Sequence, residues 1–122
     1  MTSGELVTAF INALERKDLD AACAMITEDC EYDNVPMAKV YGPAGVRSVL
    51  EPFFANCGGV EWVIHHQVAG DSVVLNERTD RFEIGGRWIG LGVAGVFEIR
   101  EGKISLWRDY FDAGLMTKAM AG

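Results

Sequence analysis

The second half of the chain is the feature that most constrains the fold, because apolar and polar residues alternate there in four consecutive segments. The segments cover residues 60–69, 73–83, 87–99 and 103–109, and short glycine-containing stretches separate them. A period of two is typical of strands with one buried face, and glycine pairs between such segments favour tight hairpin turns. This half therefore predicts a four-stranded antiparallel meander. Within its third segment, Gly90, Gly92 and Gly95 indicate a bulge or sharp curvature.

The first half is instead helical in pattern. Apolar residues recur at helical spacing over residues 6–14 (Leu6, Val7, Phe10, Ile11 and Leu14). Asp18 is expected to cap a second, shorter helix, and a third is expected to begin at Pro43 and to be kinked or shortened at Pro52. A short strand near residues 30–34 precedes it. Helices followed by a meander predict an α+β fold, with helices on the concave face of a curved sheet and a pocket between the layers.

Length and charge limit the kind of protein. With 122 residues, the chain is expected to form one domain, residues 1–122, with a core that needs no metal or disulfide. Eleven basic and eighteen acidic residues give a net charge of −7, which repels phosphate backbones and anionic lipid. We therefore expect no nucleic-acid partner and no membrane partner.

The cysteines and the amino terminus favour a cytoplasmic location. Three cysteines are an odd number, and no two of them form a CxxC pair. This pattern does not match a secreted disulfide framework and fits thiols that fill a core in a reducing compartment. The first residues have an amphipathic period and no basic head followed by an apolar run, so we expect no signal peptide.

Three pairs of residues with chemical potential are each two positions apart: Tyr32 with Asn34, Arg78 with Asp80, and Trp107 with Asp109. Residues i and i+2 of a strand point to the same face, although alternation alone does not decide which face is inward. If Arg78 and Asp80 face inward, the buried arginine needs a carboxylate partner. Two aspartates that share one arginine would lose their protons at different pH values. One of them would then keep its proton near neutrality, so the pair could act as acid and base.

Other interpretations of these residues are simpler. Arg78-Thr79-Asp80 could be a surface salt bridge, and Asp109 could cap a following helix. His65 and His66 are adjacent, so a regular strand would send them to opposite faces, one toward the core, and they could not chelate one metal ion together. We therefore expect no metal site.

Several segments of the chain resemble the limonene-1,2-epoxide hydrolase family: YDN (32–34), ERTD (77–80), LGVAGVF (91–97) and KISLWRDYFD (103–112). The resemblance covers the chain from about residue 5 to residue 112. It implies the cone-shaped α+β fold, NTF2-like or cystatin-like, that the family shares with nuclear transport factor 2, ketosteroid isomerases and polyketide cyclases. Because many activities share this fold, the site must decide the chemistry.

The resemblance also implies a reaction and its residues. The family hydrolyses an epoxide to a vicinal diol in one step, without a cofactor. Asp109 would be the general base on a water that Tyr32 and Asn34 also hold. Asp80 would protonate the epoxide oxygen, and Arg78 would bridge the two aspartates.

By the same resemblance, an apolar pocket would bind a terpene-like or cyclic epoxide through Val35, Met37, Phe82, Leu91, Val93, Phe111 and Trp107, the last of these beside Asp109. The family pairs subunits through the outer face of the sheet, so a homodimer is expected. Only AGLMTKAMAG follows Asp112, so the pocket is expected to be more open than in longer members.

Two other functions fit the same fold. A proton-transfer isomerase or cyclase would use one aspartate as base beside a phenol, without needing Arg78. A non-catalytic module that binds a small ligand would tolerate asparagine at positions 80 and 109.

Overall fold

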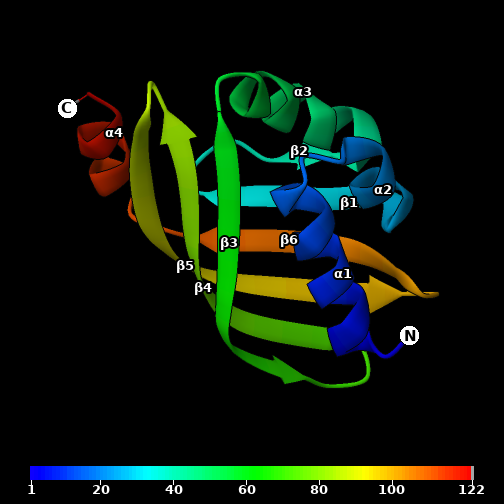
Figure 1. The fold of residues 1–122 in the computed structure, drawn as a ribbon. Coiled ribbons are helices and arrows are strands. Elements are labelled where there is room, and N and C mark those ends of the chain that lie inside the picture. The colour runs from blue at the N-terminus through cyan, green and yellow to red at the C-terminus, as the bar shows by residue number, and fades with distance from the viewer. Residues whose placement is uncertain (122) are drawn as a thin grey trace.

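The fold is α+β, as predicted, and consists of one six-stranded sheet with helices packed on it (Figure 1). The computed structural model describes residues 1–121. The elements follow in the order α1 (Ser3–Glu15), α2 (Leu19–Ala24), β1 (Ile26–Val35), β2 (Val40–Tyr41), α3 (Gly42–Ala55), β3 (Gly59–Ala69), β4 (Val73–Ile84), β5 (Arg87–Arg100), β6 (Lys103–Tyr110) and α4 (Ala113–Ala121). Among the described residues, no helix is long and apolar enough to cross a membrane.

The sheet has the strand order β2-β1-β6-β5-β4-β3. The predicted meander is present as β3 to β6, and its strands pair antiparallel. Strand β1 is longer than expected and pairs in parallel with β6, which makes the sheet mixed. This parallel pair brings the first half of the chain beside the last strand, and the short strand β2 then extends the sheet on the far side of β1.

Helix α1 begins with a capping box and lies along the edge strand β3. The side chain of Thr2 accepts a hydrogen bond from the backbone N–H of Glu5, while the Glu5 carboxylate accepts one from the backbone N–H of Thr2. At the other end of α1, Glu15 accepts a hydrogen bond from the backbone N–H of Trp62 at 2.9 Å. An exposed sheet edge offers unpaired backbone groups, and α1 satisfies part of this one.

Helix α3 continues through Pro52 to Ala55, so of the two effects expected of Pro52, a kink or a shorter helix, the shortening is wrong. Proline removes one helical hydrogen bond, the one that would reach the carbonyl of Ser48. Ser48 and Pro52 are both exposed, so water can solvate the freed carbonyl group. The apolar face of the helix, with Val46, Leu50 and Phe54, is buried against the sheet as its spacing predicts.

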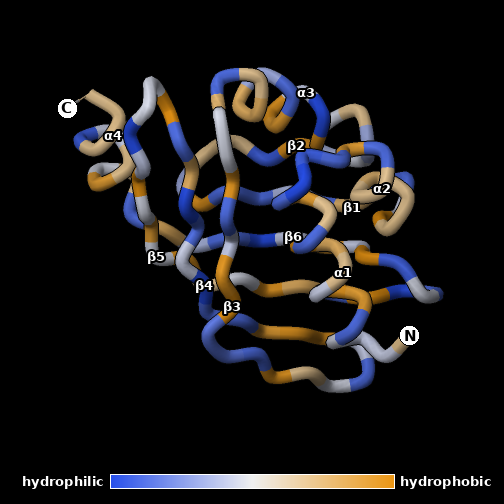
Figure 2. The backbone as a smooth tube through the Cα atoms, in the orientation of Figure 1, coloured by the Kyte–Doolittle hydropathy of each residue, from blue (hydrophilic) through white to orange (hydrophobic). Residues whose placement is uncertain are grey.

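Three aromatic rings from α1, β1 and β6 form the centre of the core. The rings of Tyr32 and Trp107 stack with centroids 3.9 Å apart, and Phe10 meets Trp107 edge-on at 4.9 Å. Around them, buried and exposed residues alternate along β5, whereas hydrophobic and hydrophilic residues follow one another in short blocks along β3 (Figure 2). The cysteines Cys23, Cys30 and Cys57 are buried free thiols, as expected of residues that fill a core.

Of the two irregularities expected at the glycines of β5, a bulge or sharp curvature, the structure has the curvature, since β4 and β5 both bend along their length (Figure 1). The β4–β5 register runs from Val73 to Ile84 without a shift, so the glycines mark no bulge in it. A bulge instead interrupts β3 between Ile64 and His66. It turns His65 and His66 to the same outer face, where both are exposed and contact Thr79 and Glu77 respectively. The predicted placement of the two histidines on opposite faces is therefore wrong.

Replacing Trp107 by alanine should lower the free energy of unfolding by about 3–5 kcal/mol, because the buried ring is the contact shared by Phe10 and Tyr32. The matched control is Trp88→Ala, since Trp88 is 42% exposed and should cost about 1 kcal/mol or less. Urea denaturation of both variants measures the difference. Equal losses in the two variants would contradict the central position of Trp107.

Candidate active site

A buried arginine joins two aspartates on the inner face of the sheet. The Nε and Nη2 groups of Arg78 each donate to an oxygen of Asp80 at 3.0 Å, and Nη2 also donates to Oδ2 of Asp109 at 2.8 Å. The Arg78 side chain is 0% exposed. Arg78 and Asp80 therefore face inward, and the interpretation of this pair as a surface salt bridge is wrong. Asp109 caps no helix, since Asp112 accepts the hydrogen bond at the start of α4.

The parallel pairing of β1 with β6 places Tyr32 and Asn34 beside this cluster. Asn34 is the register partner of Asp109, and Tyr32 is the partner of Trp107. The Nδ2 group of Asn34 donates to the hydroxyl oxygen of Tyr32 at 2.8 Å. The structure thus brings all five predicted catalytic residues together, from strands β1, β4 and β6.

One oxygen of Asp109 has no protein partner. Its Oδ1 is buried and makes no hydrogen bond to the described residues, whereas Oδ2 is held by Arg78. Buried carboxylate oxygens are ordinarily hydrogen-bonded, so Oδ1 is a free acceptor for a bound water or substrate group. Asp109 itself lines the cavity described below.

Burial controls the protonation of two of these groups. It raises the pKa of Asp80 to about 6, although the positive charge and hydrogen bonds of Arg78 act in the opposite direction. Burial also raises the pKa of Tyr32, with a further contribution from the Asp109 charge, so the phenol keeps its proton at neutral pH. The site therefore contains a carboxylic acid that is partly protonated near neutrality beside a phenol that can donate.

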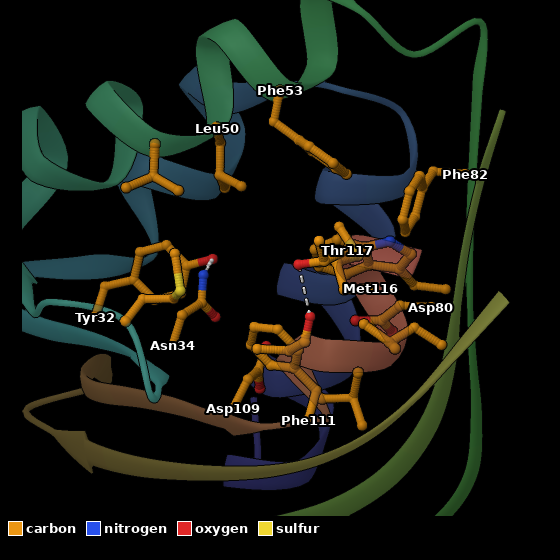
Figure 3. Close-up of a pocket in the computed structure, with 16 residues that line it drawn as sticks. Tyr32, Asn34, Leu50, Phe53, Asp80, Phe82, Asp109, Phe111, Met116 and Thr117 are labelled. Carbon is orange, nitrogen blue, oxygen red and sulfur yellow. Dashed lines mark hydrogen bonds between the residues drawn. The ribbon is translucent and has the colours of Figure 1, made fainter. Parts of the chain in front are cut away.

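These polar groups lie at one side of a cavity of about 310 Å³ between the sheet, α3 and α4 (Figure 3). The rest of the wall is largely apolar and includes five of the predicted residues, namely Met37, Phe82, Leu91, Val93 and Phe111. Met37 is 59% exposed, so it belongs to the outer part of the wall. Arg78 is absent from the lining because it lies beneath the two carboxylates.

Two residues predicted for the pocket wall, Val35 and Trp107, do not line the cavity. Val35 follows Asn34 in an extended strand, so alternation turns it away from the face that Asn34 shares with Tyr32. Trp107 does face inward, but the Tyr32 ring stacks on it and it is 0% exposed. Trp107 supports the site from within the core and does not border the cavity.

Several lining residues were not predicted for the pocket. Trp62 of β3 contributes to the wall, and its pairing with Asp80 across the predicted hairpin could have identified it. Helix α3 contributes residues that the sequence marked only as the apolar face of a helix, namely Val49, Leu50 and Phe53. Helix α4 contributes Ala113, Met116 and Thr117, so the segment after Asp112 covers part of the cavity.

Arg87 helps to hold α4 in this place. Its Nη2 group donates to the carbonyl oxygen of Ala119 at 2.8 Å, near the end of the helix. Met116 and Ala119 pack against a small cluster of buried apolar residues, Cys57, Phe82 and Ile89.

Within residues 1–121, no group of three or more histidine, cysteine, aspartate or glutamate side chains could hold a metal ion.

Comparison with known sequences gives a match over nearly the whole chain. The model of the limonene-1,2-epoxide hydrolase catalytic domain matches residues 2–122. The chain is also 39% identical over 114 residues to the epoxide hydrolase EphG of Mycobacterium tuberculosis (strain ATCC 25618 / H37Rv). That alignment covers 93% of this chain and 76% of the relative.

Solved structures agree with both the family and the fold. An LEH-like epoxide hydrolase from M. tuberculosis superposes with a TM-score of 0.83 at 38% identity, covering 96% of this chain and 87% of the other. An NTF2-like protein from Burkholderia pseudomallei superposes with a TM-score of 0.86 at 16% identity, covering 97% and 96% of the two chains. The second likeness concerns the fold alone and agrees with the NTF2-like architecture predicted above. On the evidence of the family match and the relatives together, the chain belongs to the limonene-1,2-epoxide hydrolase family.

Proposed function

We propose that this protein, acting as one domain, adds water to a small apolar epoxide and releases a vicinal diol in one step, without a cofactor. The observation that carries the proposal is the buried Arg78 hydrogen-bonded to two carboxylates at the side of an apolar cavity. The epoxide hydrolases among the relatives support the reaction class.

The water is activated by Asp109. Its free Oδ1 accepts a proton from a water that the Tyr32 hydroxyl and the Asn34 amide orient from β1. As this O–H bond breaks, the water oxygen forms a bond to one epoxide carbon. Holding water and epoxide together in one cavity removes much of the entropic cost of bringing them together.

The epoxide oxygen is protonated by Asp80. As the ring C–O bond breaks, the electron pair goes to oxygen, and the Asp80 carboxyl proton follows. A pKa of about 6 suits this role, because the group is still partly protonated near neutrality and is acidic enough to donate. Simultaneous proton removal and donation avoid both a free hydroxide and a free alkoxide.

Arg78 restores the starting state. After the reaction, Asp109 has gained a proton and Asp80 has lost one, so the combined charge of the three side chains is unchanged. The Nη2 group donates to both carboxylates, which keeps the ionised one paired whichever one it is. A buried charge without a partner would be costly, so this arrangement favours exchange of the proton between the aspartates.

The cavity supports the substrate class. Its volume of about 310 Å³ is at the small end of the usual range for ligand pockets, and apolar side chains form most of its wall. A small terpene-like or cyclic aliphatic epoxide fits this volume and polarity. The competing function, proton transfer beside a carbonyl group, needs one base and a phenol. It does not require the hydrogen bond from Arg78 to a second carboxylate.

Asp109→Asn and Asp80→Asn should each lower diol formation at least about 100-fold, because each removes one half of the acid–base pair. Chiral chromatography of products from limonene oxide, cyclohexene oxide and styrene oxide in ¹⁸O-labelled water measures this. The label should appear in the diol during a single turnover of the wild type. Tyr32→Phe and Asn34→Ala should have smaller effects, since each removes one contact to the water.

The same activity measurements also distinguish the three candidate functions. Turnover retained in either asparagine variant would contradict the acid–base mechanism. If the wild type forms no diol from any epoxide, steroid and polyketide substrates would test the isomerase or cyclase activity. Ligand binding that is unchanged in both asparagine variants, without turnover of any substrate, would instead indicate a binding module.

The pH dependence follows from Asp80. Its acid form is the active one, so kcat/KM should fall about tenfold per pH unit above about pH 6. The free energy of unfolding should also fall as the pH rises. The pKa of Asp80 is raised from 3.8 in the unfolded chain to about 6, so the folded protein binds the proton more tightly and loses stability as pH rises through this range.

Thermal unfolding of the wild type and of Asp80→Asn between about pH 4 and pH 7 isolates this effect. The variant should lose the part of the pH dependence that belongs to Asp80. An identical pH dependence of stability in both proteins, together with a wild-type kcat/KM that does not fall above about pH 6, would contradict the role of Asp80.

We also propose that two copies pair through the outer face of the sheet. Apolar side chains are exposed on that face, namely Val63, Val68, Val73, Leu75 and Tyr110. Size-exclusion chromatography with light scattering should give about twice the chain mass of 13.3 kDa, and Leu75→Glu should reduce it to one chain. A wild-type species of 13.3 kDa at all concentrations would exclude the dimer.

A cytoplasmic location stays a prediction.

A further inference from the structure

We propose that Asn76 and Gly95, neither of which contacts substrate, are positioning residues that hold the guanidinium of Arg78 between the two aspartates. The inference rests on the proposed function, because it concerns the bridge on which that reaction depends. It starts from the one nitrogen of Arg78 that faces neither carboxylate, Nη1. This nitrogen donates to Oδ1 of Asn76 at 2.9 Å, inside a region where both side chains are buried.

A chain of hydrogen bonds fixes the orientation of the Asn76 amide. Nδ2 of Asn76 donates to Oε1 of Gln67 at 3.1 Å, and Nε2 of Gln67 donates to the carbonyl oxygen of Gly4 at 3.2 Å. A guanidinium can only donate and a carbonyl oxygen can only accept. Both ends of this series of hydrogen bonds therefore require the same orientation of the two side-chain amides. Reversing either amide would set two donors or two acceptors against each other. Asn76 is thus tied to β3 and α1 and presents its oxygen to Arg78.

Gly95 provides the space that the guanidinium occupies. The register places five residues in one row across the sheet, Asn34, Asp109, Gly95, Asn76 and Gln67. Gly95 is the only member of this row without a side chain. A Cβ atom there would lie 2.5 Å from Nη1 of Arg78, 2.7 Å from Oδ1 of Asn76 and 3.0 Å from Oδ1 of Asp109. Arg78 therefore reaches both aspartates by lying over the backbone of Gly95.

A methyl group at position 95 has to displace the site itself. The atoms that it would meet belong to the bridging arginine, to its amide partner and to the proposed base. These atoms lie in a packed interior, so displacing one of them disturbs the others. Gly92 is three positions earlier on the same strand and faces the outer side, where a Cβ would meet nothing within 4 Å. It gives a matched control for adding a methyl group to β5.

The experiment compares Gly95→Ala with Gly92→Ala. Gly95→Ala should lower kcat for cyclohexene oxide about 100-fold or more, because a displacement of about 1 Å in a catalytic group costs that much. KM should change little, since the apolar part of the cavity wall is untouched. Gly92→Ala should stay within about twofold of the wild type in kcat. Gly95→Ala activity within about threefold of the wild type would overturn the proposal.

Carboxyl titration followed by ¹³C NMR on aspartate-labelled protein provides a readout without substrate. The charge of Arg78 opposes the raised pKa of Asp80, so moving the guanidinium away in Gly95→Ala should raise that pKa further. Gly92→Ala should titrate as the wild type does. If the wild type hydrolyses no epoxide, the proposed function fails while this titration still decides whether Gly95 positions Arg78. Unchanged aspartate titration in Gly95→Ala would overturn the inference.

Asn76→Ala covers the case in which Gly95→Ala does not fold. This substitution introduces no clash and removes the acceptor of Nη1 together with the donor to Gln67. It should lower kcat about tenfold with little change in KM, and should raise the pH at which activity declines. Wild-type kcat and an unchanged pH profile in Asn76→Ala would show that the amide does not position Arg78.

Discussion

The bond from one guanidinium to two buried carboxylates is the interaction on which the site depends. Arg78 has no solvent exposure, so its charge is tolerable only because Asp80 and Asp109 both bind it. The same pairing keeps two carboxylates together at the side of an apolar cavity, where their mutual repulsion would otherwise separate them. Burial then raises the pKa of Asp80 until it can act as an acid, while one oxygen of Asp109 makes no hydrogen bond to residues 1–121. Stability and chemistry thus depend on the same three side chains.

The sheet arranges these groups through its register. The parallel β1–β6 pair sets Asn34 beside Asp109, and the antiparallel pairs set Asn76 and Gly95 in the same row. On the opposite face, Arg108 binds Asp33 and Glu31 at 2.9 Å each and joins β6 to β1 a second time. The rows that carry the site are therefore held by backbone pairing, by the aromatic core around Trp107 and by two ion pairs on the outer surface.

Expectations that depend on the alternation within one strand were confirmed where the strand is regular. Expectations that depend on contacts between strands and helices needed the tertiary structure. Alternation correctly placed Arg78 and Asp80 on one face, and the resemblance correctly grouped them with Asp109, Tyr32 and Asn34. The histidines were misplaced because a bulge at Ile64 changes the phase of β3, and alternation assumes that no residue is extra. Trp107 was expected on the cavity wall, but the Tyr32 ring covers it, and a ring stacked on another cannot be found from spacing along a single strand.

By itself, the sequence determined the α+β class, the strands of the meander, the apolar faces of α1 and α3, and the residues able to perform acid–base chemistry. These follow from local periodicity, from turn residues and from resemblance, all of which the order of residues contains. Only the tertiary structure decided that β1 pairs in parallel with β6, that α4 covers part of the cavity, and that Gly95 leaves room for Arg78. These features arise between segments far apart in the chain, where packing of many side chains at once selects the contact.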